Sequence, residues 1–128
     1  MGAVALDARV LIGLLEEGDA HHARAMTELR VRAAREDRLL LVASAYAEIL
    51  VGPMRKGHEA VVDGFIRDSR TEVVPIDAEL ARAAARLRAR HRALRLADAL
   101  VLACAHRHEA ELLTFDDRLR RIARERRA

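Results

Sequence analysis

The sequence predicts one α/β domain with a three-layer α/β/α arrangement, in which helices cover both faces of a short, mostly parallel sheet of four or five strands. Short apolar runs alternate along the chain with longer segments of helical periodicity, as in strand–helix–strand units. The 128 residues suit a single domain. No repeat, low-complexity stretch or Gly/Ser-rich linker divides them, so we assign residues 1–128 to one domain.

Four apolar runs are the predicted strands. Each is followed within two residues by an Asp or a Ser, which are residue types that begin helices. Pro75 lies in the third run, and because proline cannot donate to a strand ladder, we expect this strand at an edge of the sheet. The four runs cover residues 3–6, 39–42, 71–76 and 111–114.

The segments between and after these runs are the predicted helices. Gly18 ends the first helix, and the pair Gly52-Pro53 is expected to break the third. The predicted capping residues are Asp19, Ser44, Asp77 and one of Asp116 and Asp117. The helices are predicted at residues 8–17, 19–35, 46–51, 58–67, 77–91, 96–108 and 117–126.

Composition argues against several classes of protein. Aromatic residues make up 2% of the chain, which leaves no platform for the base stacking used by sheet-based RNA-binding modules. Cys104 is the only cysteine, so neither an internal disulfide nor a cysteine metal cluster is expected. We find no signal peptide and no apolar run near the ~18 residues of a membrane span, and we expect a cytoplasmic protein without membrane association.

The basic residues are nearly all arginine. The net charge is +3, and Lys56 is the only lysine among 23 basic residues. A coding bias toward arginine is sufficient to explain this composition. A phosphate-binding surface is the functional interpretation, because the planar guanidinium fork matches phosphate geometry. The two interpretations are compatible.

Three acidic residues, Asp7, Glu48 and Asp98, interrupt apolar segments. Burial of an unpaired carboxylate costs several kcal/mol, so such residues persist where they cap a helix, pair with a cation or bind a metal. Asp7 and Asp98 have a partial structural explanation, because each is predicted near a helix N-terminus, where negative charge is favoured. Glu48 has no such explanation, since it is predicted a full turn inside its helix.

These acids are predicted to meet at one end of the sheet, because ligand sites of parallel sheets lie at the carboxyl ends of the strands. Asp116, with Thr114 as a hydrogen-bond donor, follows the last predicted strand to the same end, and Asp117 is the alternative to Asp116. Ionised carboxylates repel by about 4 kcal/mol per pair at about 4 Å and an effective dielectric of about 20. A cation is therefore expected, and all-oxygen ligands favour Mg²⁺ or Mn²⁺.

The order of the segments around these acids resembles PIN-domain ribonucleases, and it is most similar to the VapC toxins of bacterial toxin–antitoxin pairs. The segments are Asp7 with the apolar run 10–12, then 47–52, 96–100 and 114–116. The resemblance implies a PIN-like fold and an endoribonuclease that cleaves RNA, with tRNA or rRNA as the expected target, by Mg²⁺- or Mn²⁺-activated water. It also implies a homodimer that is neutralised by a cognate antitoxin.

The resemblance carries over residue by residue. It implies that Asp7, Glu48 and Asp98 are the central catalytic acids and metal ligands and that Asp116 is the fourth. Thr114 matches the small hydroxyl residue two positions before the fourth acid, and Asp117 is the less favoured neighbour of Asp116.

Two residues depart from the family pattern. Many members carry small hydroxyl or amide residues directly after the first aspartate, where this chain has Ala8 and Arg9. Arg9 is available to bind the scissile phosphate or to pair with an acid of the site. It also sustains an alternative function, that of a non-catalytic PIN-fold protein that binds RNA or a partner. Arg9 argues against an Asp-x-Asp phosphatase, and the position of Lys56 argues against a receiver-type phosphoacceptor.

Overall fold

The centre of the molecule is a parallel sheet. The computed structural model describes residues 2–127, with side chains described through residue 125. Within this part of the chain, four strands follow the order β3-β2-β1-β4, and all neighbouring strands are parallel. The strands are β1 (Ala3–Leu6), β2 (Arg38–Val42), β3 (Glu72–Val74) and β4 (Glu111–Leu113). The predicted α/β class is confirmed, with four strands and no antiparallel pair among them.

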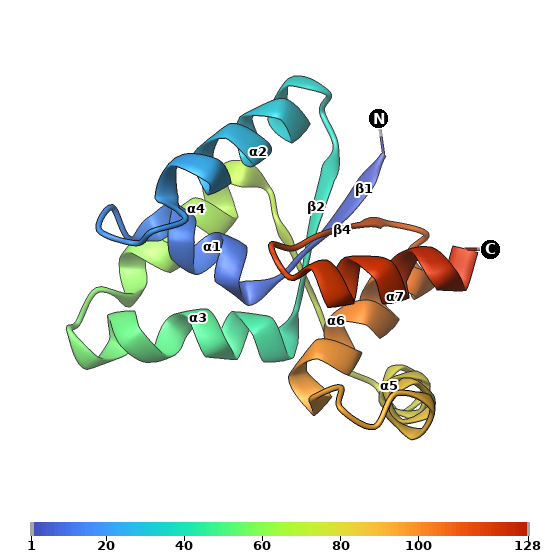
Figure 1. The fold of residues 1–128 in the computed structure, drawn as a ribbon. Helices are drawn as coiled ribbons and strands as arrows, with labels where there is room; N and C mark the ends of the chain where they lie inside the picture. Colours follow the sequence, from blue (N-terminus) through green and yellow to red (C-terminus); the bar gives the residue numbers. More distant parts are fainter. Residues whose placement is uncertain (1, 128) are drawn as a thin grey trace.

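The crossovers between strands place the helices in two layers. β1, β2 and β3 follow one another across the sheet, so right-handed connections put α1 to α4 on one face. The chain then passes back beyond β1 to β4, and this reversed step puts α5 and α6 on the other face, beside α7 (Figure 1). The helices are α1 (Ala8–Leu15), α2 (His22–Ala34), α3 (Ala43–Arg55), α4 (Glu59–Ser69), α5 (Ala78–Arg90), α6 (Leu96–Arg107) and α7 (Asp117–Arg127).

This reversal makes the boundary between β1 and β4 a topological switch point, where α/β sheets open a crevice at the carboxyl ends of their strands. The register pairs Leu6 with Leu113. The ladder ends one step later, where the Asp7 N–H donates to the Leu113 carbonyl at 3.1 Å. The residues that follow the two strands, Asp7 and Thr114, therefore lie side by side.

The core is aliphatic, as the low aromatic content requires. Val4, Leu40 and Leu102 are fully buried among the two helix layers and the sheet. α6 is buried without interruption from Asp98 to Ala105, because its apolar residues face the sheet on one side and the neighbouring helices on the other. Among the described residues, no helix combines the length and hydropathy that a membrane span needs.

The expected break of the third helix at Gly52-Pro53 is wrong. α3 runs through both residues to Arg55. Pro53 lies in the last turn, where its missing N–H removes one helical hydrogen bond. Its carbonyl accepts the N–H of His58 at 2.8 Å, which closes the helix end. Proline near a helix C-terminus therefore costs this helix little.

Two of the predicted caps are also wrong. α3 begins at Ala43 with Val42 as its N-cap residue, so Ser44 lies inside the first turn, and its hydroxyl has no hydrogen-bond partner among the described residues. α2 begins at His22, and Asp19 instead accepts the His21 N–H at 2.8 Å in the turn before the helix.

Two other predictions, one for a helix start and one for an edge strand, are confirmed. Asp77 caps α5 by accepting the Leu80 N–H at 2.8 Å. β3 is an edge strand, and it stops at Val74, directly before Pro75.

Candidate active site

The four predicted acids line one pocket at the carboxyl end of the sheet. Asp7 follows β1, Glu48 lies on α3, Asp98 lies in the first turn of α6, and Asp116 precedes α7. All four border a pocket of about 340 Å³. Four separate elements thus bring carboxylates from distant parts of the chain to the switch point of the sheet. The other polar or aromatic side chains of the pocket are Arg9, His21, Arg95 and Phe115.

Asp7 is one of the two buried acids of the pocket, with 9% of its surface exposed. It occupies the N-cap position of α1 and makes no side-chain capping hydrogen bond, although the backbone N–H groups of Ala8 and Arg9 are close enough to favour its charged form. Burial raises the pKa of its carboxyl, a hydrogen bond from Thr114 partly opposes that rise, and the charge of Asp98 adds to it. The folded protein therefore keeps the Asp7 carboxyl in an environment that disfavours its charged form.

Thr114 joins the two strand ends at the site. Its hydroxyl, in a side chain that is 1% exposed, donates to Asp7 Oδ2 at 2.7 Å. The same oxygen accepts the N–H of Asp116 at 3.1 Å. A single buried hydroxyl therefore orients the carboxylate after β1 and fixes the chain after β4.

Asp98 is 7% exposed and faces the pocket from the start of α6. It lies in the first turn of the helix, where the backbone N–H groups carry partial positive charge. The Arg95 guanidinium also pairs with it, with 3.3 Å between Arg95 Nε and Asp98 Oδ2. Arg95 is the N-cap residue of the same helix and is largely exposed.

Glu48 differs from the sequence-based expectation. Its neighbours Ala45 and Ile49 are buried on the inner face of α3, whereas Glu48 is exposed on the adjacent face at the pocket rim. Partial loss of hydration raises the pKa of its carboxyl, and the charge of Asp7 raises it further. The expectation of an acid enclosed in an apolar segment is wrong, and what distinguishes Glu48 is its place opposite Asp7 and Asp98.

The structure also resolves the ambiguity between Asp116 and Asp117. Asp116 Oδ1 accepts the N–H groups of Arg118 and Leu119 at 2.9 Å and 3.3 Å, so Asp116 caps α7 while it borders the pocket. Asp117 is exposed and pairs with Arg120 at 2.9 Å, away from the pocket lining. Asp116 thus both caps α7 and borders the pocket, whereas the sequence suggested a different aspartate for each position.

Two arginines border the acids. Arg9 is exposed at the pocket and makes no ion pair within 4.0 Å of a carboxylate among the described residues, so it does not pair with Asp7. Sequence reasoning did not single out Arg95. For Arg95 a signal was present, because it stands three residues before Asp98, a spacing that brings side chains together at a helix start.

The oxygen donors of the pocket suit a hard divalent cation by their chemistry. Within residues 2–127, however, no three His, Cys, Asp or Glu side chains are grouped closely enough to hold a metal ion as they stand. Asp7 and Asp98 are buried, and Glu48 and Asp116 are exposed at the rim. Two acids are thus enclosed and two lie at the rim, so an ion bound here would require the four carboxylates to lie closer together.

Comparison with known proteins gives one family. The family model described as PIN domain matches residues 4–125. No curated protein sequence matches the chain.

Solved structures share the fold. One is Mycobacterium tuberculosis VapC20, described as a sarcin–ricin loop cleaving toxin, with 24% identity, a TM-score of 0.73 and coverage of 91% of this chain and 92% of that one. Another is VapBC2 from Rickettsia felis, bound to a DNA fragment from its promoter, with 18% identity, a TM-score of 0.74 and coverage of 95% and 93%. Neisseria gonorrhoeae FitAcB has 20% identity, a TM-score of 0.73 and coverage of 94% and 92%. At these identities the likeness establishes the fold alone.

Proposed function

The chain belongs to the PIN domain family, and we propose that it is a divalent-metal-dependent endoribonuclease that acts as the toxin of a toxin–antitoxin pair. The observation that carries this proposal is the convergence of Asp7, Glu48, Asp98 and Asp116 on one pocket at the switch point of the sheet. Two of these acids are buried, and the charge of Asp98 opposes the ionisation of Asp7. Such a set is stable in its ionised form when a cation offsets the repulsion.

In this proposal the four acids are the ligands of one or two Mg²⁺ or Mn²⁺ ions. A bound ion of this kind activates water as a nucleophile and offsets the negative charge that develops on a phosphodiester during hydrolysis. The products are expected to carry a 5′-phosphate and a 3′-hydroxyl. Asp7 and Asp98 supply fixed oxygens from the pocket floor, while Glu48 and Asp116 complete the set from the rim.

Other residues of the chain support these acids. Thr114 keeps the Asp7 carboxylate in one orientation through its 2.7 Å hydrogen bond. Arg9 and Arg95 place positive charge beside the acids, where an RNA phosphate has to enter. Guanidinium groups suit this task because they donate several hydrogen bonds in one plane. We assign both arginines to the positioning of the scissile phosphate.

The partners follow from the same proposal. The structural neighbours from Rickettsia felis and Klebsiella pneumoniae are described as toxin–antitoxin complexes or carry a VapBC name. By analogy, we propose a cognate antitoxin for this chain, an RNA substrate of the tRNA or rRNA class, a homodimeric assembly and a cytoplasmic location.

One experiment tests the activity. Purified full-length protein is incubated with labelled cellular RNA in Mg²⁺, in Mn²⁺ and in EDTA. We expect EDTA-sensitive cleavage that Asp98→Asn reduces by more than about 100-fold, since even the outer partners of metal ligands contribute about 10–100-fold. The matched control is Asp68→Asn, which removes an exposed acid outside the pocket and should retain activity. Full activity of Asp98→Asn refutes the site.

A non-catalytic role in binding RNA or a partner is the second candidate. The observation that favours it is the ion pair between Arg95 and Asp98, which occupies one of the proposed metal ligands. In that case the same incubations give RNA binding without cleavage in either metal.

A further inference from the structure

A second cavity adjoins the acidic pocket. It has a volume of about 410 Å³ and lies over β4 between α2 and α7. Phe115 lines both cavities, and Thr114, which borders the second, is bonded to Asp7 in the first. The two cavities therefore share a wall at Phe115.

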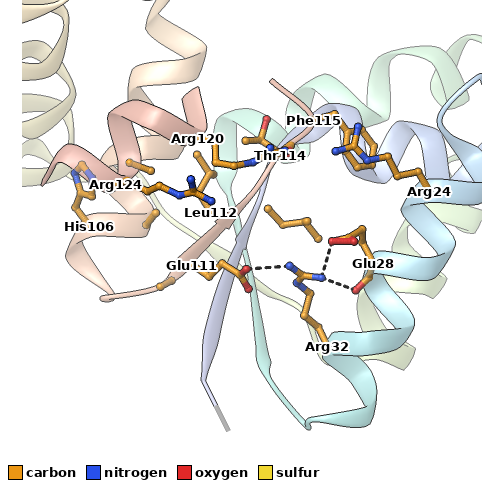
Figure 2. Close-up of a pocket in the computed structure, with 14 residues that line it drawn as sticks. Arg24, Glu28, Arg32, His106, Glu111, Leu112, Thr114, Phe115, Arg120 and Arg124 are labelled. Atoms are coloured by element: carbon orange, nitrogen blue, oxygen red, sulfur yellow. Dashed lines mark hydrogen bonds and ion pairs between the residues drawn. The ribbon is translucent and has the colours of Figure 1, made fainter. Parts of the chain in front are cut away.

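The two ends of the cavity differ in charge. At the end away from the acids, the buried guanidinium of Arg32 is held between Glu28 and Glu111, each at 2.9 Å (Figure 2). Glu111 also pairs with Arg35 at 3.6 Å, so two arginines and two glutamates balance in charge at this end. Both arginines there are engaged by glutamates, although the Nε of Arg32 has no hydrogen-bond partner among the described residues.

The end next to Phe115 is cationic. Figure 2 shows Arg24 against Phe115, Arg120 beside Thr114, and Arg124 directed toward Leu112. Arg120 and Arg124 are four residues apart on α7 and so share one helix face. Three guanidinium groups from two helices thus line this part of the cavity, with Arg24 and Arg120 next to Phe115 and Thr114 and with Arg124 further along the same wall, beside Leu112.

Two of these guanidinium groups are held in place. The guanidinium carbon of Arg24 lies 4.3 Å from the centre of the Phe115 ring, a cation–π distance. His21 contacts the same ring with 5.0 Å between ring centres. Arg120 donates to the Thr114 carbonyl at 2.8 Å and to Asp117 at 2.9 Å. Their positions are therefore set before any ligand arrives.

Arg24 and Arg124 retain their donors for a ligand. Neither guanidinium group forms a hydrogen bond or an ion pair with another residue in the part of the chain that the structure describes. Each is exposed to solvent at the cavity wall. Arginine forks with open donors and little local negative charge are the side chains that bind phosphate oxygens best.

We propose that this cationic half, made by Arg24, Arg120 and Arg124 around Phe115, binds a phosphate of the RNA strand that flanks the cleaved phosphodiester. The inference rests on the proposed ribonuclease function and adds a subsite to it. The subsite contributes affinity and fixes the direction in which the strand crosses the acids. Because Phe115 is already covered by Arg24 and His21, it positions Arg24 rather than serving as a stacking surface for a base.

The test measures binding separately from cleavage. Affinity for a short single-stranded oligoribonucleotide is measured by fluorescence anisotropy in EDTA, across a series of salt concentrations. The pocket variant is Arg24→Gln with Arg124→Gln. The matched control is Arg30→Gln with Arg86→Gln, which removes two exposed arginines of α2 and α5 that border none of the cavities described here.

The pocket variant is expected to bind RNA at least about tenfold more weakly than the control. The slope of log affinity against log salt should fall by about 0.7 for each lost phosphate contact. A neutral methylphosphonate placed at successive positions of the oligonucleotide should weaken binding to the wild type at one position beside the cleavage site. The pocket variant should be insensitive at that position.

Equal RNA affinity of the pocket variant and the control overturns the inference. It is overturned in the same way if the pocket variant loses affinity for inorganic phosphate alone, or for a protein partner alone, while RNA binding is retained. Failure of the proposed function gives a different result, because RNA then binds in a pocket-dependent manner and is not cleaved in Mg²⁺ or Mn²⁺. Cleavage by the wild type with no dependence on the pocket leaves the function standing and removes the subsite.

Discussion

The hydroxyl of Thr114 donates a 2.7 Å hydrogen bond to the carboxylate of Asp7, across 107 residues of chain. The two residues directly follow the neighbouring parallel strands β4 and β1. The bond therefore couples the completion of the sheet to the orientation of a buried acid in the candidate active site.

Replacing Thr114 by valine removes this hydroxyl at nearly constant volume. Asp7 then loses a donor in a buried setting, so we expect a loss of about 1–3 kcal/mol in the free energy of unfolding. RNA cleavage should fall about 10–100-fold, as for other partners that orient metal ligands. Urea denaturation and initial cleavage rates measure the two effects. Thr114→Ser keeps the hydroxyl and is the control; equal activity of the valine variant and the wild type would contradict the role of this bond.

Replacing Asp7 by asparagine should raise the thermal stability of the protein and abolish its activity. Burial raises the pKa of Asp7 above its ordinary value of 3.8. A carboxyl with a raised pKa in the folded state contributes its full stability below the unfolded pKa, and that contribution is lost as the pH rises through the folded value. The variant cannot ionise, so without metal it should melt at a higher temperature than the wild type at pH 7, while being inactive. The difference should shrink toward pH 4, and a lower melting temperature of the variant at pH 7 speaks against a raised pKa.

Arg95→Gln should strengthen metal binding. The guanidinium that it removes lies 3.3 Å from Asp98 and competes with a cation for that carboxylate. Because the pair is exposed on the arginine side, the gain in Mn²⁺ affinity should be about two- to fivefold. Isothermal titration without RNA measures it. RNA cleavage should slow, because in the proposed function the Arg95 guanidinium also positions the scissile phosphate. The neighbouring Arg92→Gln, outside the acidic pocket, is the control, and equal Mn²⁺ affinity of the two variants would disprove the competition.

Cys104 should be chemically inert in the folded protein. It is 1% exposed within α6, and burial raises the pKa of its thiol to about 11. Since the thiolate is the reactive form, a disulfide reagent at pH 8 should modify the native protein at least about 100-fold more slowly than the protein in urea. The raised pKa also predicts that stability falls as the pH increases from about 9 toward 11. Rapid modification of the native protein at pH 8 would contradict this burial.

The fold was predictable because its signals are local and agree with one another. Each buried strand is a short apolar run, and capping residues such as Asp77 mark helix starts in the chain itself. The edge position of β3 follows from Pro75 alone. What failed depends on position along a helix. Pro53 breaks a helix when it is central and is tolerated in the last turn, and the sequence does not tell how many residues follow it before the helix ends.

The sequence predicted which acids meet at the candidate site, but not how exposed each acid is or which groups it contacts. Apolar neighbours in the sequence suggested that Glu48 is enclosed, yet a helix turns each residue about 100° from the last, so Ala45 and Ile49 are buried while Glu48 is not. The double role of Asp116 depends on the direction in which the chain leaves β4. Arg24 and Phe115 are 91 positions apart in the chain, and no local sequence pattern indicates their contact.

The position of β4 in the chain has a consequence for how the protein folds. Thr114 reaches Asp7, and Asp116 reaches the pocket, only when β4 inserts next to β1, a pairing between segments that are 107 residues apart. Contacts of such long sequence separation form late, because the loop between them has to close first. A chain in which β4 has not yet paired with β1 therefore lacks the fourth carboxylate and the hydroxyl that orients the first. The proposed activity would be absent from such a chain.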